Sequence, residues 1–556
     1  MKNFTNLLFH STKEEQIKNI ETFFKLTKHK REYTAEEVAN LRTSHVDSIP
    51  TTAIFTARRM RDKLSKMSID STSHFRSLGC LNPTQARALS EATYNTSNQA
   101  VDGIYISGWQ EASSGENTYS TMFPDQSIYP VNSVPEKIKK MNNVLIAAER
   151  VRQEKLRSSI LTDEEKEKLK DIQYQVPIIA DMEAGFGQEI HTFQLAVECI
   201  KAGVACVHLE DQDGSLKKCG HMGGKVKVSI SQFINKLKSI RLAADVLGAD
   251  TVIIARTDAM GTQLINNVSN KVDRTFCYKG FKKSEFLKNA LLGSYFKDVS
   301  VLYDQLMYHK VLEEKVISGK KQIVINHDLY LKLLDSEKDS KTFNAIISHL
   351  KKTLSLTDDK AKALYSFFEM TPFLATADGY YRYNASLDAA IKVGLAVAPY
   401  CDLIWFETAH PSLEDAKIFA TEIHKKYPGK MFHYNCSPSF NWKKNFVEKY
   451  GDDYERNLKN FGQELAKLGF KSQKITLFGM HVINQAMKDR VNGFQENGML
   501  GYSRLQEEEK ESGNQSLEHQ SFVGVNVWAD VTMACTDENN ELLATQGESA
   551  TMDQFE

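Results

Sequence analysis

The chain has 556 residues, and its 70 Lys and Arg against 71 Asp and Glu leave a formal net charge of -1 at pH 7. Its 41% hydrophobic and 25% charged residues are typical of an ordinary globular protein. The balanced charge argues against nucleic-acid and anionic-membrane partners, because both bind to basic surfaces. No apolar run approaches the ~20 residues that a membrane span needs. These properties favour a large enzyme that acts on a small-molecule substrate.

The spacing of the cysteines and the sequences at the two ends of the chain favour the cytoplasm as the cellular compartment. The 8 Cys are scattered and form no CxxC pair, which is typical of reduced thiols rather than of disulfides or a zinc site. The first residues become acidic too early for a signal peptide, and the last residues do not form an SKL-type peroxisomal signal. We therefore expect a cytoplasmic protein.

The first element in chain order is predicted to be a helix. Ser11 and Glu14 have the spacing of a capping box, which marks the start of a helix. Ile17 and Ile20 then follow at helical intervals. We expect an N-terminal helical segment over residues 1–73.

Short, nearly continuous apolar runs follow, each typical of a strand that is buried on both faces. They lie at 74–80, 103–109, 176–185, 206–212, 251–258, 401–408, 431–437 and 475–480. Helical patterns separate them, and the last of these is predicted to end at Gly469. Eight strands that alternate with helices predict an α/β fold, a (β/α)8 TIM-type barrel with parallel strands.

Between the fifth and sixth strands the chain is too long for a single connection. The middle of this segment, 279–370, is rich in Lys, contains no Arg and has an amphipathic helical pattern from Phe343 to Leu354. After residue 482 the sequence is again helical and highly charged. We expect barrel parts at 74–262 and 379–482, an inserted helical subdomain at 263–378 and a C-terminal helical segment at 483–556.

Polar side chains recur near the carboxyl ends of the predicted strands. In a barrel these ends meet on the face that carries active sites. One such residue could be ordinary loop chemistry, but carboxylates, Arg and small hydroxyls that repeat over seven strands favour a shared site. The residues are Ser107, Trp109, Asp181, Glu183, His208, Glu210, Arg256, Glu407, Asn435, Ser437 and Thr476.

A loop at 217–221, Lys-Lys-Cys-Gly-His, carries the most reactive group. A lone cysteine is usually a small core residue. Here Cys219 lies among Lys217, Lys218 and His221, and neighbouring cations favour the reactive thiolate form. Because Gly220 follows directly and two further glycines come after Met222, the loop can move. We expect a mobile loop that carries an acid/base thiol.

The loop Lys217-Lys-Cys-Gly-His221 resembles the signature of the isocitrate lyase family, within the isocitrate lyase/phosphoenolpyruvate mutase superfamily. Similar segments occur in the family's order at 105–110, 123–135, 178–187, 208–212, 253–259, 403–408, 434–442 and 475–477. The insert and residues 379–386 resemble the longer, eukaryote-type members. The resemblance implies cleavage of isocitrate to glyoxylate and succinate in the glyoxylate cycle. It also implies a homotetramer whose C-terminal helices are exchanged between subunits.

The resemblance implies a Mg2+ cofactor, for which Mn2+ can substitute. Asp181 would be the direct ligand, and Asp125, Glu183 and Glu210 would hold metal-bound waters. Mg2+ takes oxygen ligands and keeps several waters, so a group of carboxylates suits it. Asp181 and Glu210 follow apolar strands, where two carboxylates would be costly without a cation.

The resemblance also assigns the two ends of the substrate. Arg256 would grip the carboxylate of glyoxylate with its planar fork. The other glyoxylate-binding residues would be Ser107, Gly108 and Trp109. The succinate carboxylates would be bound by Asn435, Ser437, Ser439 and Thr476, joined by Gly220 and His221 when the loop closes.

Cys219, assisted by His221, would act as the general acid on the succinate carbanion. The base that takes the substrate's hydroxyl proton stays open among Tyr105, a carboxylate and a metal-bound hydroxide. Glu407 and His208 would orient the loop and the metal cluster. Trp405 fits a pocket wall and an ordinary core residue equally well.

Two positions depart from the family pattern. Lys474 takes the place of an aromatic residue, and Phe478 takes the place of a small one. Both flank Thr476 and could alter the succinate pocket. A hydrophobic pocket discriminates one methylene by only about 1–3 kcal/mol, so a 2-methylisocitrate lyase is the nearest alternative. A barrel without catalytic activity, used as a scaffold, is a remote one.

Overall fold

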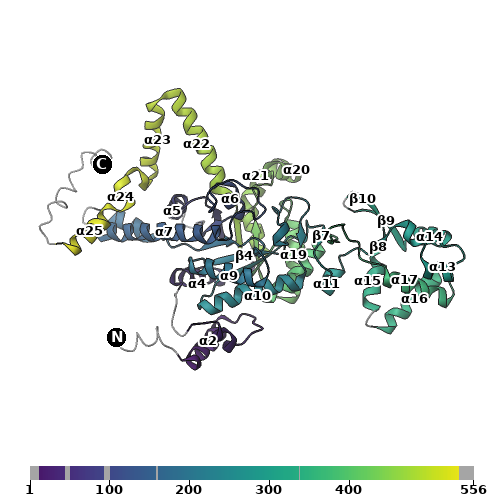
Figure 1. Ribbon diagram of the computed structural model, residues 1–556. Helices are drawn as coiled ribbons and strands as arrows, with labels where there is room; N and C mark the ends of the chain where they lie inside the picture. The colour runs from purple at the N-terminus through teal and green to yellow at the C-terminus, as the bar shows by residue number, and fades with distance from the viewer. Residues whose placement is uncertain are drawn as a thin grey trace.

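The structure is a computed structural model that describes residues 12–43, 50–92, 101–157, 161–317, 319–336 and 339–536. Eight parallel strands form a closed barrel in which each strand pairs with the next along the chain, and the last pairs with the first. The prediction of a (β/α)8 TIM-type barrel is therefore confirmed (Figure 1). The strands are β1 (Phe75–Gly79), β2 (Gly103–Ile106), β3 (Ile178–Asp181), β4 (Cys206–Glu210), β6 (Val252–Thr257), β12 (Leu403–Phe406), β13 (Met431–Asn435) and β14 (Ser472–Ile475).

Helices cover the outside of the barrel because each has an apolar face that must be buried. Every residue of β4 and β6 is buried, as expected for strands that are covered on both faces. The covering helices include α5 (Pro83–Ala92), α7 (Ser133–Arg157), α9 (Glu189–Lys201), α10 (Ile230–Leu247), α18 (Leu387–Val397), α19 (Leu413–Lys426), α20 (Trp442–Tyr450) and α21 (Tyr454–Lys467). Gly469 follows α21 with a φ of +97°, in agreement with its predicted place after the helix.

Two predicted boundaries are wrong. The last barrel strand, β14, ends where the predicted run at 475–480 begins, and Phe478 already starts helix α22 (Phe478–Asn497). Polar Ser472 and Lys474 are buried against His433 and Trp405, so the strand does not show the apolar run of its neighbours. The first described helix, α2 (Lys13–Thr27), is capped by Thr12 and Glu15 instead of Ser11 and Glu14. Ser11 lies outside the described residues.

The inserted segment forms a second hydrophobic core that projects from the barrel (Figure 1). The predicted amphipathic helix is confirmed as α16 (Ser340–Leu354). The insert also contains a small antiparallel sheet that the sequence did not predict, formed by β8 (Gly280–Phe281), β10 (Lys320–Ile325) and β9 (Leu312–Ile317). The remaining helices of this core are α12 (Lys283–Leu287), α13 (Ala290–Tyr295), α14 (Val299–Tyr308), α15 (His327–Ser336) and α17 (Asp358–Met370).

A small sheet joins the insert to the cysteine loop. β5 (Val226–Lys227) follows the loop and pairs with β7 (Leu264–Ile265), which pairs in turn with β11 (Tyr381–Arg382). β7 leads into the insert and β11 leads out of it. A buried ion pair between Lys227 and Asp273, 2.9 Å long, strengthens this junction. Both ends of the insert are thus anchored beside the loop that carries Cys219.

The N-terminal segment closes the opposite end of the barrel. Helix α3 (Ala35–Asn40) packs on α10, and Met60 and Leu64 of α4 (Thr51–Ser65) pack against the barrel interior. Asp402, just before β12, accepts hydrogen bonds from Arg61 at 2.8 Å and from Arg241 at 3.0 Å. Burial alone would raise the pKa of Asp402, but the two guanidinium groups lower it below the usual value.

We predict that Asp402→Asn lowers the free energy of unfolding by about 1.5–3 kcal/mol, because hydrogen bonds to a charged group are lost. A lowered carboxylate pKa stabilises the fold above the unfolded pKa, and this stability is lost as the pH falls. The difference between wild type and variant should therefore shrink in acid. Urea unfolding at several pH values tests this, with exposed Asp452→Asn as the control; equal stability at pH 7 would contradict the prediction.

The C-terminal segment is helical as far as it is described. Helices α22 and α23 (Met499–Ser512) extend away from the barrel as a pair, whereas α24 (His519–Val523) and α25 (Val525–Cys535) lie along α7 (Figure 1). Among the described residues, no helix is both long and apolar enough to cross a membrane.

Candidate active site

A cavity of about 130 Å³ opens at the carboxyl ends of the barrel strands. It brings together residues that lie far apart in the chain, from Tyr105 to Leu477. Predicted site residues on its wall are Tyr105, Ser107, Trp109, Asp125, Asp181, Cys219, Gly220, His221, Arg256, Glu407, Asn435, Ser437, Ser439 and Thr476, joined by Lys217 and Trp405. Gly108, Glu183, His208 and Glu210 do not line it but contact residues that do.

The cysteine loop lies over the cavity, held by bonds to the strand ends. Gln212 holds the loop backbone, with Nε2 2.9 Å from the carbonyl oxygen of Lys218. Lys225 binds Asp258 at 2.8 Å and also donates a hydrogen bond to the carbonyl of Gly220. A Cβ atom at position 220 would meet the end of the Arg256 side chain, so a larger residue there would displace the guanidinium. Cys219 is thereby placed on the cavity wall.

His221 carries a positive charge beside the thiol. Its Nε2 lies 3.4 Å from Glu407 Oε1 and 3.1 Å from the carbonyl oxygen of Thr408. Burial would lower the pKa of His221, but the Cys219 and Glu407 side chains raise it to about 10. An imidazolium next to Cys219 stabilises negative charge on the sulfur.

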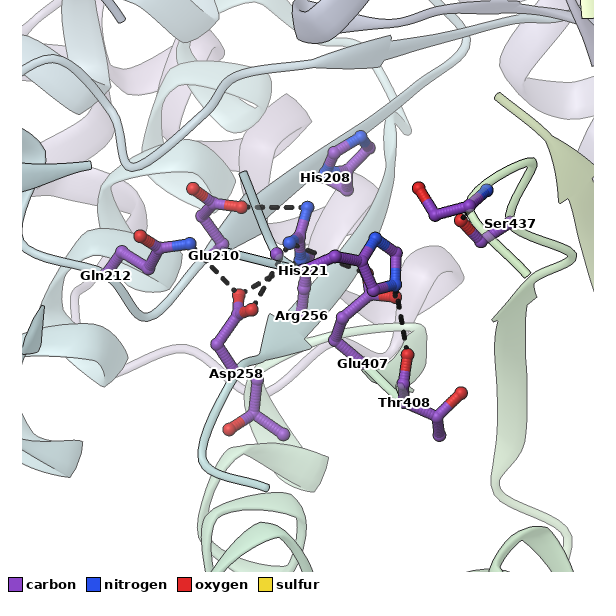
Figure 2. A network of polar contacts seen from close by, with 12 residues as sticks. His208, Glu210, Gln212, His221, Arg256, Asp258, Glu407, Thr408 and Ser437 are labelled. Atoms are coloured by element: carbon purple, nitrogen blue, oxygen red, sulfur yellow. Dashed lines mark hydrogen bonds and ion pairs between the residues drawn. The ribbon is translucent and has the colours of Figure 1, made fainter. Parts of the chain in front are cut away.

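Arg256 is surrounded by carboxylates, as Figure 2 shows. Its guanidinium lies 2.9 Å from Glu210, 3.1 Å from Asp258 and 3.5 Å from Glu407. Burial disfavours the charge, but these carboxylates raise the pKa of Arg256 well above its usual value. The guanidinium also stacks over Trp405, with 4.5 Å to the ring centroid. Trp405 is both buried, at 1% exposure, and part of the cavity wall.

Asp181 is held by two backbone amides. Gly108 N donates to Oδ2 at 3.0 Å, and Glu183 N donates to Oδ1 at 2.8 Å. A side chain at Gly108 would collide with Glu183, so glycine lets the backbone approach Asp181. Burial would raise the pKa of Asp181, but its basic neighbours, His208 first and then Lys217 and Arg256, lower it below its usual value. Asp181 is therefore an anion on the cavity wall.

The Tyr105 hydroxyl lies between Asp181 and His208. It is 3.3 Å from Asp181 Oδ2 and 2.8 Å from His208 Nε2. Burial raises the pKa of Tyr105 well above its usual value and lowers that of His208 well below it. Both groups are therefore neutral hydrogen-bonding groups at neutral pH.

Lys217 was predicted only as a cation near Cys219, but it has a more specific position. Its ammonium forms ion pairs with Asp125 and Glu183. Tyr129 donates a hydrogen bond to Glu183 Oε1 at 2.5 Å. Burial raises the pKa of Glu183 to about 7, against the effect of Lys217. In the described part of the chain, no three His, Cys, Asp or Glu side chains are close enough to hold a metal ion together.

Several residues of this network were not predicted: Tyr129, Lys225 and Asp258. Tyr129 and Asp258 lie within segments that resemble the family, and Lys225 follows the glycines of the cysteine loop. The sequence shows that these three polar residues lie within or next to the motifs. Their partners were not, because Lys225 pairs with Asp258 across 33 residues and Tyr129 with Glu183 across 54.

A group of hydroxyls and amides forms the remaining wall. The backbone N of Ser439 donates to Ser437 Oγ at 3.1 Å, which orders the loop after β13. Asn435 Oδ1 is buried and accepts no hydrogen bond from the residues that the structure describes. Thr476 follows β14 directly. This wall offers uncharged donors opposite the carboxylates of Asp181 and Asp125.

The comparison with protein families decides the relationship. A model described as "Isocitrate lyase family" matches residues 14–555. The chain belongs to the isocitrate lyase family. An isocitrate lyase of Halalkalibacterium halodurans is 33% identical over 520 residues, covering 93% of this chain and 92% of that protein. One of Salmonella typhimurium is 34% identical, covering 90% and 89%, and one of Pinus taeda is 32% identical, covering 97% and 91%.

The two departures from the isocitrate lyase pattern leave the cavity wall intact. Phe478 is 39% exposed and lines a separate hollow along α22, formed by residues between 475 and 490. Lys474 lies inside the barrel and is not among the residues that line the cavity. It contacts Tyr105 and Trp405, which do line it. Neither Lys474 nor Phe478 lines the cavity, so neither side chain contacts the proposed succinate pocket directly.

Proposed function

We propose that this protein is an isocitrate lyase that cleaves isocitrate to glyoxylate and succinate with Mg2+. The observation that carries the proposal is one cavity with three different walls. A thiol beside an imidazolium forms the first, the carboxylate of Asp181 with Arg256 forms the second, and uncharged donors form the third. A retro-aldol cleavage needs an acid, charge stabilisation and carboxylate binding, and these walls supply them.

The bond changes can be assigned to opposite sides of the cavity. A base on the side of Tyr105 and Asp181, for which this chain offers the carboxylates of that wall, takes the proton of the substrate hydroxyl, and the carbon that bore the hydroxyl becomes the aldehyde of glyoxylate. The carbon–carbon bond breaks, and its electron pair moves to the succinate carbon. Cys219 then donates the thiol proton to this carbanion, which leaves a thiolate beside the imidazolium of His221. Arg256 faces the glyoxylate carboxylate, and Asn435 faces those of succinate.

The residues fit a divalent cation. Asp181 would hold it directly, and Asp125, Glu183 and Glu210 would hold it through water. All four donors are oxygen ligands, and Glu210 Oε1 accepts no hydrogen bond from any described residue. Asp125 and Glu183 already attract the ammonium of Lys217. When bound, the ion supplies positive charge that stabilises the negative charge developing on the substrate oxygens.

Turnover of isocitrate and of 2-methylisocitrate, each with Mg2+ and with EDTA, tests the proposal. We expect glyoxylate to form from isocitrate with Mg2+ only, and little pyruvate to form from 2-methylisocitrate. A preference for the methylated substrate would assign the protein to the alternative reaction. Lack of turnover with either substrate would favour the hypothesis of a barrel without catalytic activity that serves as a scaffold.

We further propose a homotetramer with exchanged C-terminal helices. Within α22 and α23, all of whose residues are described, only Gly479 is buried. Apolar side chains such as Phe494, Met499 and Leu500 are more than half exposed, and such patches mark protein interfaces. Sedimentation should therefore give a tetramer, and a stable, active monomer would refute this assembly.

The pH profile should report the pair of His221 and Glu407. The pKa of His221 is raised from 6.5 to about 10, so the imidazole is charged at neutral pH and loses its charge as the pH rises through about 10. We predict that kcat/KM falls near pH 10 and that Glu407→Gln moves this fall to lower pH. Exposed Glu414→Gln is the control. An unmoved alkaline limb in Glu407→Gln would contradict the assignment.

A further inference from the structure

Lys474 is a buried lysine whose role the reaction does not explain. It lies on β14 inside the barrel with 1% exposure. Its Nζ is within ion-pair distance of no carboxylate among the residues that the structure describes, although other buried lysines here, such as Lys227, pair with one. A buried amine without partners is costly, so its hydrogen bonds must be made elsewhere.

The partners of the Lys474 amine are two aromatic faces and one imidazole. Nζ lies 3.7 Å from the ring centroid of Tyr105 and 3.8 Å from that of Trp405. It also lies 3.4 Å from His208 Nε2. The amine therefore packs against both ring faces, in the geometry in which such faces attract an ammonium group. The side chain is thus held between two residues that form part of the cavity wall.

His208 Nε2 is shared between Lys474 and Tyr105. This nitrogen has either one lone pair or one hydrogen, so it serves one of the two neighbours well. If Nε2 accepts a hydrogen from Lys474, the Tyr105 hydroxyl must donate elsewhere. If Nε2 carries a hydrogen, it donates that hydrogen to the Tyr105 oxygen, 2.8 Å away. In a third arrangement Nε2 accepts the Tyr105 hydrogen, and Lys474 then loses this bond. The Tyr105 hydroxyl donates toward Asp181 Oδ2, 3.3 Å away, only when Nε2 is taken by Lys474 or carries the hydrogen itself.

We propose that Lys474 is a positioning residue that holds Tyr105 and Trp405 from beneath the cavity and turns the Tyr105 hydroxyl toward Asp181. The inference rests on the proposed lyase function, because Tyr105 lies where the substrate loses its hydroxyl proton. Its effect is confined to this side of the cavity. Cys219, on the opposite wall, does not contact Lys474.

A double-mutant cycle tests the proposal, with Lys474→Met and Tyr105→Phe made singly and together. Misplacing a reacting group by about 1 Å can cost 10²-fold in rate. We expect Lys474→Met to lower kcat by about 10–100-fold with little change in KM. Because Lys474 acts through Tyr105, adding Lys474→Met to Tyr105→Phe should cause no further loss. A second readout is exchange of succinate hydrogens with D2O, which needs Cys219 and should persist in Lys474→Met.

Lys471→Met is the matched control. Lys471 is also buried at the start of β14, but it binds the carbonyl oxygen of Ser71 at 2.6 Å, away from the cavity. The variant Lys471→Met should therefore leave kcat unchanged. If Lys474→Met does not fold, Lys474→Leu takes its place in the same cycle, because an apolar side chain suits this buried position.

Two results would overturn the proposal: an unchanged kcat in the folded Lys474 variant, or losses that multiply in the double variant. If Lys474 only supported the fold, Lys474→Met would disturb both sides of the cavity, and succinate exchange would fall together with kcat. If the wild-type protein does not cleave isocitrate, the proposed function fails and the inference fails with it. If the wild type cleaves isocitrate and the cycle is additive, only the role of Lys474 is refuted.

Discussion

Replacement of Cys219 by serine should lower kcat for isocitrate cleavage by about 10²–10⁴-fold, the usual contribution of a general acid. A serine hydroxyl is a far weaker acid than a thiol, so the succinate carbanion would lack its proton donor. The loop should stay in place, because the bonds of Lys225 and Gln212 that hold it do not involve the sulfur. KM for isocitrate should therefore change much less than kcat.

The matched control is Cys436→Ser. Cys436 lies next to Asn435 but does not line the cavity, and burial raises the pKa of its thiol to about 12. This variant should retain wild-type turnover. Exchange of succinate hydrogens in D2O provides an independent readout, since it should disappear in Cys219→Ser and persist in Cys436→Ser. Full lyase activity in Cys219→Ser would remove the thiol from the mechanism.

The second large effect is expected at Arg256. In the variant Arg256→Met, the buried carboxylates of Glu210, Asp258 and Glu407 lose their shared cation. Lys225 still neutralises Asp258 and His221 still neutralises Glu407, so the main loss falls on Glu210. Removal of one partner of a buried ion pair costs about 3–5 kcal/mol where the remaining charge is left uncompensated. We therefore expect a loss of this size in the free energy of unfolding, together with loss of measurable turnover.

Urea unfolding, followed by circular dichroism, measures this loss. Arg490→Met is the control, since Arg490 forms an exposed ion pair with Glu508 on the projecting C-terminal helices and should contribute little. The decrease in Arg256→Met should become smaller as the pH is lowered, because the freed carboxylates can then take up protons. Equal stability of Arg256→Met and wild type would show that the three carboxylates are neutral in the folded protein.

The barrel was predictable from local sequence because its strands are buried on both faces. Such strands need apolar residues at almost every position, and β4 and β6 show this clearly. β14 was misplaced because Ser472 and Lys474 fill the interior there. The sheet of the insert was missed for a related reason: β9 buries its two end residues and leaves charged residues between them partly or fully exposed.

The site residues were predicted from motifs, and the structure brings them to one face of the barrel. Cys219, Asp181 and Arg256 lie on one cavity, as expected for the carboxyl ends of neighbouring strands. The partners of these residues could not be predicted. Lys217 pairs with Asp125 across 92 residues, and only the closed barrel brings them into contact.

By itself, the sequence determined the fold class, the family and the chemical groups of the site, because these depend on residue type, periodicity and short motifs. The tertiary structure alone decided which charges neutralise one another and which residues support the site from beneath. Lys474 shows the difference. Its residue type suggested an altered pocket, but folding places its amine between Tyr105 and Trp405, behind the wall. Contacts of this kind join strands that are distant in the chain, so they arise only when the barrel closes.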